Sequence, residues 1–237
     1  MSASSSAPVV HVVAAAVIDA AGRVLIAQRP SGKHMAGGWE FPGGKLEPGE
    51  ERLAGLAREL REELGISIIG TPRPLIRVRH AYPSREVLLD IWVVKRYSGE
   101  ARGLDGQALR WCTQDELETA ELLPADRPIV RALRLPERLT QTASRDYCVG
   151  DLGSLGRSAA VADGGTAPRP RGVFCSSAEE GSAAAKAGAD FLVMRIVLAD
   201  EELKMLCGMI SVPLYALGIG LEKAWELGAS GLSEIRA

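Results

Sequence analysis

The apolar and polar positions in the first half of the chain predict several strands and one long amphipathic helix. The apolar runs 9–18 and 23–28 flank a turn-forming stretch at 19–22, which predicts a β-hairpin. Leucine and alanine recur at helical spacing from about 51 to 64, and Gly65 follows where a C-terminal cap belongs. Further strands are expected at about 74–81, 86–96 and 109–112, before a last helix within 124–135.

From residue 172 the pattern becomes a regular alternation of short apolar runs and amphipathic stretches. Such an alternation indicates βαβ units around a parallel sheet. We expect strands at 172–176, 190–194, 212–216 and 231–235, and helices at 178–187, 200–208 and 220–227.

Four segments follow from these patterns. Residues 1–8 are expected to be a disordered N-terminus, and residues 9–137 form the first domain. Residues 138–171 are rich in Ser, Thr, Gly, Asp and Pro and are expected to be a linker or irregular segment. Residues 172–237 form the second domain, so the chain is expected to combine two α/β domains.

The composition is that of a folded globular protein without a nucleic-acid or membrane partner. Of the 237 residues, 46% are apolar and 24% are charged. A net charge of −2 lacks the basic character of proteins that bind nucleic acids or membrane surfaces. The longest uncharged stretch, 205–221, is interrupted by Pro213 and glycines. The four cysteines are far apart without metal-ligand spacing, which favours a cytoplasmic protein with reduced thiols.

The predicted long helix carries Glu59, Glu62 and Glu63 on one face, at spacing i, i+3 and i+4. Neighbouring like charges destabilise a helix by a few tenths of a kcal/mol per pair, roughly. A divalent cation among them reverses this effect, and hard oxygen ligands suit Mg²⁺ or Mn²⁺. A triplet of this kind by itself is also typical of a solvated acidic face, so the surrounding residues decide between the two interpretations.

The surrounding residues complete a longer motif that runs from Gly44 to Ile66. It reads Gly-x5-Glu-x7-Arg-Glu-aliphatic-x-Glu-Glu-x-Gly-aliphatic without a mismatch. This segment resembles the signature of the Nudix hydrolases. The resemblance implies an α/β/α sandwich with a mixed sheet. It also implies an enzyme that cleaves a diphosphate linked to another moiety, with Mg²⁺ as cofactor or Mn²⁺ in its place.

The resemblance also implies a role for each matching residue. Glu59, Glu62 and Glu63 correspond to metal-binding carboxylates, and Glu59 also to a general base for the attacking water. The backbone carbonyl of Gly44 corresponds to a further metal ligand. Glu50 and Arg58 correspond to positions that orient the loop and the helix.

Residues outside the motif resemble the MutT subfamily, the 8-oxo-dGTP diphosphatases. The string Trp39-Glu40-Phe41-Pro42-Gly43-Gly44-Lys45 matches the loop that leads into the motif. Asp105 begins an acid-Gly-Gln segment whose acid supplies another metal ligand in that subfamily. The substrate-binding residues that the resemblance implies are Arg29, His34, Phe41, Gly43, Lys45, Arg85 and Asp126.

Asp126 departs from the subfamily, in which the matching residue is Asn. An amide offers both a donor and an acceptor to a base edge, whereas an ionised carboxylate offers acceptors alone. Asp126 can therefore read a base if it is protonated or if the base presents two donors. Other interpretations stay open, because Asp126 also fits a helix N-cap, Asp105 a turn and His34 an idle surface position.

The resemblance implies hydrolysis of a nucleoside triphosphate, most strongly 8-oxo-dGTP, to a nucleoside monophosphate and pyrophosphate. Alternatives that keep the chemistry are ordinary dNTPs, CTP or a nucleoside diphosphate linked to another group. A different class of function is a sensor that binds a nucleotide without turnover. The complete motif argues against a sensor, since pure binding does not require every one of these carboxylates.

Residues 172–237 resemble the last βα units of a thiamine phosphate synthase barrel, which implies a partial, half-TIM-like domain. The matching strings are 184–191, 212–218 and 227–231. A full barrel needs eight βα units in about 200 residues or more, so a second active enzyme is not expected. The expected role is a degenerate domain for packing or homodimerisation. Ligand binding and a poorly ordered tail are the alternatives.

Overall fold

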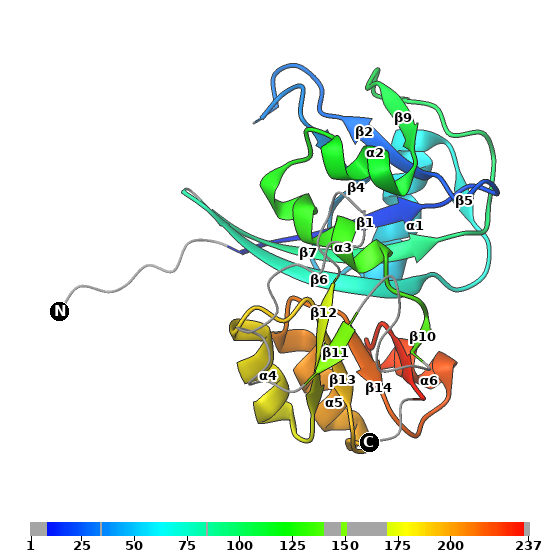
Figure 1. The fold of residues 1–237 in the computed structure, drawn as a ribbon. Helices are drawn as coiled ribbons and strands as arrows, with labels where there is room; N and C mark the ends of the chain where they lie inside the picture. Colours follow the sequence, from blue (N-terminus) through cyan, green and yellow to red (C-terminus); the bar gives the residue numbers. More distant parts are fainter. Residues whose placement is uncertain (1–8, 34, 84, 140–147, 151–169, 235–237) are drawn as a thin grey trace. The chain divides into compact units, whose positions relative to one another are not determined.

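The computed structural model describes residues 9–33, 35–83, 85–139, 148–150 and 170–234 (Figure 1). The N-terminus expected to be disordered lies outside these ranges. The chain divides into two compact units. The first contains Met1–Arg73 and Val78–Arg127, and the second Pro74–Arg77 and Pro128–Ala237. No helix among the described residues is long and apolar enough to cross a membrane.

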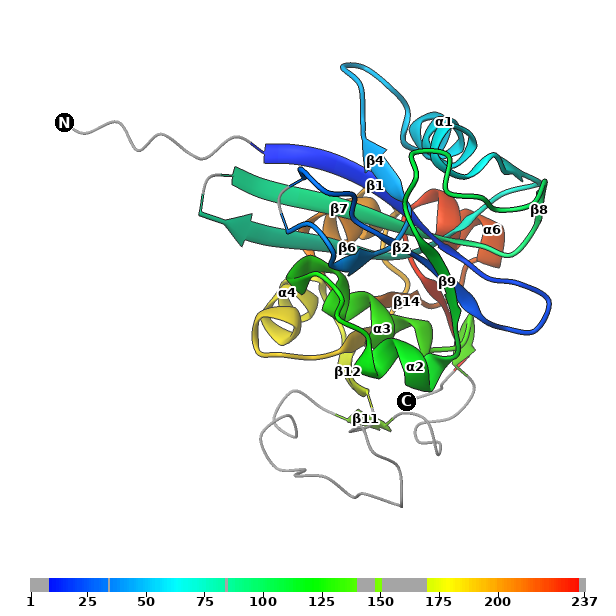
Figure 2. The same ribbon diagram turned by 90° about the horizontal axis from the view of Figure 1, so that it is seen from above.

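The first unit contains most of a mixed sheet with the strand order β4-β1-β7-β6, in which residues 74–77 of β6 belong to the second unit. Seen from above in Figure 2, β1, β7 and β6 run side by side. The bounds are Val9–Val17 for β1, Gly43–Lys45 for β4, Arg73–Tyr82 for β6 and Arg85–Val94 for β7. β1 is parallel to β7 and antiparallel to β4. Two smaller sheets join β3 (Trp39–Glu40), β2 (Val24–Gln28) and β9 (Leu109–Cys112), and β5 (Ser67–Ile68) with β8 (Tyr97–Ser98). This mixed α/β fold confirms the expected fold class of the first half.

The expected hairpin between the first two strands is wrong as a sheet pairing. The turn exists, since Asp19 accepts hydrogen bonds from the backbone N–H groups of Ala21 and Arg23. However, β1 and β2 share just one isolated bridge, Ile18↔Val24, and belong to different sheets. The C-terminal part of β1 is buried on both faces and therefore takes a central position between β4 and β7.

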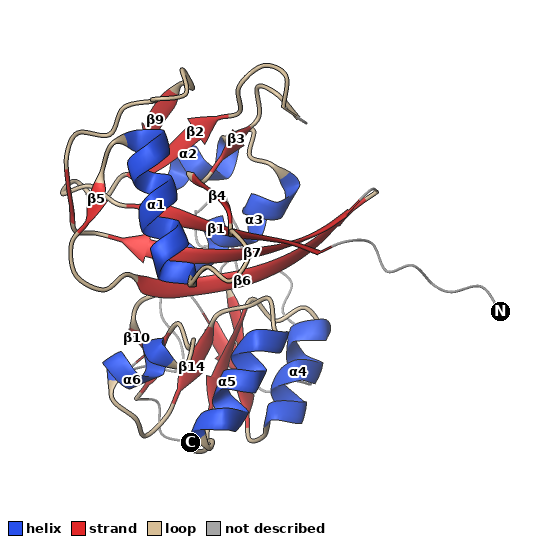
Figure 3. Ribbon diagram, turned by 180° about the vertical axis from the view of Figure 1, so that it is seen from behind, coloured by secondary structure: helices blue, strands red, loops and turns tan. Residues whose placement is uncertain are grey.

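Helix α1 (Arg52–Leu64) covers one face of the mixed sheet, as Figure 3 shows from behind. It ends as expected at Gly65, whose φ of 68° is the left-handed conformation that glycine adopts without strain. The helix buries Leu56, Leu60 and Leu64. They pack against Val13, Ala15, Val17, Trp92 and Val94 of the sheet.

The C-terminal part of the first half contains one helix more than expected. The predicted last helix appears as a 3-10 turn, η1 (Pro124–Asp126), followed by α3 (Arg127–Leu133). Helix α2 (Gln114–Thr119) is the additional one. Its capping box joins Thr113 and Glu116, a Thr-x-x-Glu pattern that the sequence displays.

The second unit contains a curled parallel sheet with the order β10-β15-β14-β13-β12-β11. Its strands are β10 (Arg138–Leu139), β11 (Cys148–Gly150), β12 (Arg171–Cys175), β13 (Phe191–Met194), β14 (Leu214–Ala216) and β15 (Gly231–Ser233). Its helices are α4 (Ala178–Lys186), α5 (Asp200–Met209) and α6 (Leu221–Glu226). The alternation expected from residue 172 onward is therefore confirmed. β10 and β11 fall inside the range expected to be a linker.

Both faces of this parallel sheet are packed. One face lies against the helices, through apolar residues such as Val173, Leu192 and Leu214. The other face carries aromatic side chains in a second buried cluster that also includes Leu135 and Leu139. Its members on the sheet are Phe174, Phe191, Val193 and Tyr215. The described residues give no support to homodimerisation, one of the two roles expected for this domain.

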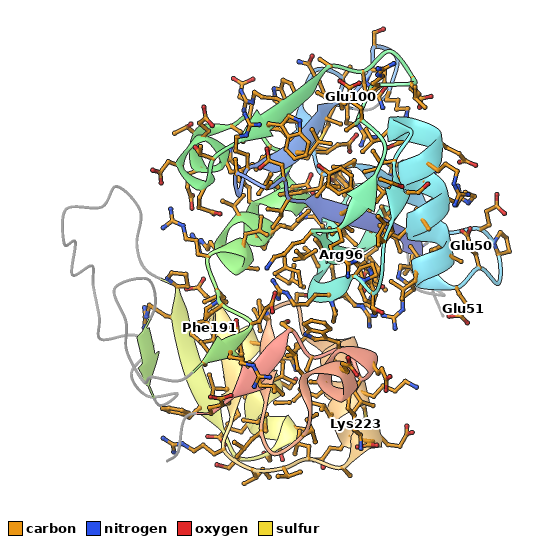
Figure 4. The ribbon with its side chains drawn as sticks, turned by 90° about the vertical axis from the view of Figure 1, so that its right-hand side faces the viewer. Glu50, Glu51, Arg96, Glu100, Phe191 and Lys223 are labelled. Atoms are coloured by element: carbon orange, nitrogen blue, oxygen red, sulfur yellow. The ribbon has the colours of Figure 1, made fainter. Side chains whose placement is uncertain are left out.

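Glycines in neighbouring strands make room for two of these aromatic rings. Gly172 is paired with Phe191, and Gly231 with Tyr215. A Cβ atom at Gly172 would come within 2.3 Å of the Phe191 ring, and one at Gly231 within 2.8 Å of the Tyr215 ring. Figure 4 labels Phe191 within this unit. The interior of the curled sheet is filled by side chains.

Candidate active site

The first unit contains a cavity of about 580 Å³ on the sheet face that points away from α1. Alternating residues of β1 point to opposite faces of the sheet. Val13 and Ala15 pack with α1, whereas Val12 and Ala14 line the cavity. β7 adds Leu89 to the same lining. The sheet therefore provides a flat apolar wall of the kind that suits a planar ring.

Glycines in the edge strand β4 allow carboxylates of α1 to reach this cavity. A Cβ atom at Gly44 would lie 2.3 Å from the carboxyl carbon of Glu59, so the missing side chain leaves the space that this carboxylate occupies. A Cβ atom at Gly43 would lie 2.2 Å from the carbonyl oxygen of Val13. The Gly43 N–H donates to Glu63 Oε2 at 3.3 Å. Glu59, Glu63 and the β4 backbone thus meet at one end of the cavity.

Arg58 organises the loop and helix around this end. Its Nε and Nη2 donate to the two carboxylate oxygens of Glu50 at 2.8 and 2.9 Å. Its Nη1 donates to Glu59 and Glu62, and its Nη2 also to the Lys45 carbonyl. The hydrogen bonds from Arg58 lower the pKa of Glu50 to about 2, and Glu50 in turn raises the pKa of Arg58. In Figure 4, Glu50 lies beside the N-terminal end of α1.

Two of the predicted metal ligands lie outside the main cavity. The Glu62 side chain is 60% exposed and pairs with Arg58. Asp105 lines a separate small cavity of about 10 Å³ together with Gln107 and Glu63. Gln107 Nε2 donates to the Glu63 carbonyl, so this segment contacts α1. No group of three or more His, Cys, Asp or Glu side chains that could hold a metal ion occurs in the described part of the chain.

The site shifts the pKa of the Glu63 carboxyl into a range that a titration can measure. Burial raises its pKa from 4.5 to about 7, and the negative charge of Glu59 acts in the same direction. The carboxylates of Glu59 and Glu63 lie together at one partly buried end of the cavity, beside the two glycines that begin β4. Hard oxygen donors in this arrangement fit a divalent cation such as Mg²⁺.

Asp126 marks a second, polar end of the cavity. It is 4% exposed, and burial raises its pKa well above the ordinary value, with a further contribution from the charge of Glu40. Arg29 opposes this shift and forms an ion pair with Glu40. The charge of Glu40 also raises the pKa of Glu63, and all three carboxyl groups line the same cavity. Burial and the charge of Glu40 favour the protonated form of this carboxyl, and in that form it offers one donor and one acceptor.

The family model of the NUDIX domain matches residues 13–132, about half of the chain. These residues include the complete motif and the cavity end at Asp126. The chain belongs to the Nudix family. The match and the geometry of Glu59, Glu63 and Gly44 identify the first unit as a Nudix hydrolase.

Curated relatives of this Nudix hydrolase are pyrophosphohydrolases of small nucleotides. The chain is 41% identical over 120 residues to the CTP pyrophosphohydrolase of Escherichia coli, covering 51% of this chain and 88% of the relative. It is 35% identical over 114 residues to the 8-oxo-dGTP diphosphatase of the same organism, covering 47% and 85%. The solution structure of the E. coli ORF135 protein is 38% identical, with a TM-score of 0.48, and covers 53% of this chain and 89% of that protein.

Most residues expected to contact substrate line the Nudix cavity. Arg29, Phe41, Gly43, Lys45, Arg85 and Asp126 all do so. The guanidinium of Arg85 also lies 5.9 Å from the centre of the Tyr82 ring. His34 lies outside the described residues. The basic side chains of Arg29, Lys33, Lys45 and Arg85 line the cavity and favour a polyanionic ligand.

The structure adds lining residues that sequence reasoning missed. Glu40, Lys33 and Tyr82 carry charge or a hydroxyl into the cavity, and Val10, Val12 and Leu89 form its apolar wall. Glu40 stands within the Trp39–Lys45 string, but a motif does not reveal its ion pair with Arg29. The wall residues alternate along β1 and β7, and this alternation is a signal that could have found them.

Proposed function

We propose that the protein hydrolyses a nucleoside triphosphate to a nucleoside monophosphate and pyrophosphate, with 8-oxo-dGTP as the preferred substrate. The observation that carries this proposal is one cavity with Glu59, Glu63 and Gly44 at one end and a buried carboxyl, Asp126, at the other. The four basic residues that line the cavity suit the triphosphate, and the apolar wall suits the base. The complete Nudix motif and the names of the two relatives support the same reaction class.

We propose Mg²⁺ as the cofactor, with Mn²⁺ as a substitute. Glu59, Glu63 and the Gly44 carbonyl would hold it, with Glu62 and Asp105 as further ligands that the family motif implies. When bound, such an ion neutralises charge on the phosphate oxygens and lowers the pKa of coordinated water.

The chain's own groups account for the remaining steps. Lys45 and Arg85, which line the cavity, hold the phosphate chain. Glu59, fixed by Arg58 and by the space at Gly44, accepts the proton of the attacking water. Water attacks a phosphorus of the α–β anhydride, the bond from that phosphorus to the bridging oxygen breaks, and the nucleoside monophosphate and pyrophosphate leave.

Asp126 supplies the proposed base selectivity. A neutral carboxyl presents one donor and one acceptor, as the Asn of the MutT subfamily does. The Hoogsteen edge of 8-oxoguanine presents an N–H donor beside the O6 acceptor, whereas that of guanine presents two acceptors. An unmatched buried polar group costs about 1–3 kcal/mol, which corresponds to a discrimination of roughly tenfold to a hundredfold.

CTP is a second candidate substrate. The relative with 41% identity is named a CTP pyrophosphohydrolase. Cytosine also presents a donor, its N4 amino group, beside its N3 acceptor, so Asp126 in its protonated form fits it as well. A broader activity on dNTPs or on nucleoside diphosphates linked to another group would follow if Asp126 does not read the base.

The test compares kcat/KM for 8-oxo-dGTP, dGTP and CTP in the wild type and in Asp126→Asn and Asp126→Ala proteins. Base reading by a neutral acid predicts that Asp126→Asn keeps the substrate order of the wild type, while Asp126→Ala loses it with kcat nearly unchanged. An unaltered order in Asp126→Ala contradicts the role of Asp126. Tight nucleotide binding without turnover by the wild type would instead support the sensor.

We further propose that the second unit is a degenerate, non-catalytic domain similar to part of a thiamine phosphate synthase barrel. The sequential parallel strands and the filled sheet interior support this assignment. An interior filled with aromatic rings leaves no room for a ligand there, which favours a structural role. Sedimentation of the full chain tests whether this unit forms a homodimer. We place the enzyme in the cytoplasm, where its nucleotides and reduced thiols occur together.

A further inference from the structure

An ionic cluster around the buried Asp90 lies on the α1 face of the mixed sheet, on residues to which the Nudix motif assigns no role. Asp90 of β7 is 5% exposed, and its Oδ2 atom is 2.8 Å from His11 Nε2 of β1. The same oxygen is 3.6 Å from the guanidinium of Arg52, the first residue of α1. The Arg52 guanidinium also lies 5.7 Å from the centre of the Trp92 ring. The cluster therefore joins two strands to the beginning of α1.

The cluster lies on the opposite face of the sheet from the nucleotide cavity. Asp90, Trp92 and Val94 are two residues apart along β7, so their side chains point to the same face of the sheet. Trp92 and Val94 pack with α1, whereas Leu89 points to the opposite face and lines the cavity. None of His11, Arg52 and Asp90 lines the cavity. The His11 carbonyl accepts the N–H of Leu46, directly after the glycine strand β4. The cluster thus connects α1 to the strands around Gly44 without touching a bound nucleotide.

The N-terminal end of α1 has no side-chain cap of its own. Glu51 occupies the N-cap position, beside the end of the helix in Figure 4, without a side-chain capping bond, and the first turn contains no acid. A cation at this end of a helix is unfavourable by itself, because the helix dipole is positive there. Asp90 adds a negative charge from the sheet at this end and pairs with Arg52.

Arg52 and Glu59 share one face of α1. They are seven residues apart, about two turns or roughly 10 Å along the helix. Leucine packing along this face is non-directional and tolerates small rotations of the helix. A charged contact at one end of the same face opposes such rotation, and a misplacement of about 1 Å in a catalytic group can cost about 100-fold in rate.

We propose that His11, Asp90 and Arg52 are positioning residues that fix the rotation of α1, so that Glu59 and Glu63 face Gly44. The inference rests on the proposed hydrolysis, in which these carboxylates hold a divalent cation. It predicts a loss in kcat and in metal affinity without a loss in nucleotide affinity.

The experiment uses the full chain with Asp90→Asn, Arg52→Gln and the double variant. The control is Arg138→Gln, which breaks an exposed ion pair with Glu234 in the second unit. Turnover of 8-oxo-dGTP gives kcat and KM, Mn²⁺ binding without nucleotide is measured by electron paramagnetic resonance, and thermal unfolding reports stability. We expect kcat and Mn²⁺ affinity to fall about 10-fold or more in each single variant, with KM unchanged. The double variant should lose little more than either single one.

Folded single variants with wild-type kcat and wild-type Mn²⁺ affinity overturn the proposal, even if their Tm is lower. The control should match the wild type in every readout, and a control that falls equally also overturns it. If Asp90→Asn does not fold, Arg52→Gln decides, because its side chain is partly exposed. If the wild type turns over no triphosphate, the proposed function fails, and the Mn²⁺ affinities still decide this inference.

Discussion

Glycines within strands make room for opposite kinds of side chain in the two units. In the first unit, Gly44 of β4 leaves space for the Glu59 carboxylate at the edge of an open cavity. In the second unit, Gly172 and Gly231 leave space for the rings of Phe191 and Tyr215, which fill the sheet interior. The same backbone freedom thus opens a charged site in one unit and completes an apolar core in the other.

The contrast shows where function and stability reside in this chain. In the first unit, the surroundings of Glu63 raise the pKa of its carboxyl. Ionisation of this carboxyl near neutral pH therefore destabilises the folded, metal-free protein. The second unit's sheet buries apolar groups on both faces. Substitutions at glycines in the two units should therefore affect different measurable quantities.

The largest effect is expected for Gly44→Ala. The new Cβ atom would lie 2.3 Å from the Glu59 carboxyl carbon, so the carboxylate must move. Hydrolysis should fall about 100-fold or more, because a catalytic carboxylate displaced by about 1 Å loses that much. Steady-state kinetics measure the effect. Gly220→Ala in the second unit is the control, since a Cβ atom there would have no other atom within 4 Å, and equal activity of the two variants would contradict the site.

Glu63→Gln should lower activity and raise the stability of the metal-free protein. The folded-state pKa of Glu63 is raised from 4.5 to about 7, so its stabilising effect is complete below pH 4.5 and is lost as pH rises through 7. The Glu63→Gln variant has no group that ionises at this position, so it does not lose this stability. It should be more stable than the wild type at pH 8 by about 2 kcal/mol. Urea unfolding with a chelator at pH 8 measures the gain, and no gain would show that Glu63 is not strained.

Gly231→Ala should destabilise the second unit while hydrolysis by the folded protein is kept. Its Cβ atom would lie 2.3 Å from the Glu137 carbonyl oxygen and 2.8 Å from the Tyr215 ring. Overpacking of this kind costs about 1–3 kcal/mol. Thermal unfolding gives the destabilisation, and kcat/KM at low temperature gives the activity. A large fall in kcat/KM of fully folded protein would contradict the separation of roles between the units.

The smallest effect is expected for Tyr215→Phe. The Tyr215 hydroxyl donates to the Pro136 carbonyl at 2.6 Å, and its removal leaves the ring packing in place. The expected loss of unfolding free energy is about 1 kcal/mol. Chemical denaturation is sufficient to detect it. A loss as large as that for Gly231→Ala would mean that the hydrogen bond, and not the ring, holds the interior together.

Much of the fold follows from local patterns, but strand pairing does not. The periodicity places α1 to within a residue and gives every strand and helix after residue 172. The hairpin expected from the turn at 19–22 fails, because the partner of β1 is β7, more than seventy residues later. Local turn chemistry indicates where the chain bends, whereas burial on both faces decides which strands become neighbours.

The candidate site divides in a similar way. The motif names Glu59, Glu63, Gly44 and Arg58, because their spacing on one helix and one loop is local. It cannot separate Glu63, which is partly buried and lines the cavity, from Glu62, which is exposed beside Arg58. Nor does it reveal that Asp126 is buried near Glu40 and Arg29, because those residues meet through the tertiary fold alone.

The most direct test of the central claim is kcat/KM for 8-oxo-dGTP against dGTP, measured by pyrophosphate release with Mg²⁺. We predict a preference for 8-oxo-dGTP of about tenfold or more, which corresponds to at least about 1.4 kcal/mol, with a nucleoside monophosphate as the second product. Equal rates on both triphosphates would contradict base reading by Asp126. The absence of turnover on any nucleoside triphosphate would contradict the proposed hydrolysis itself.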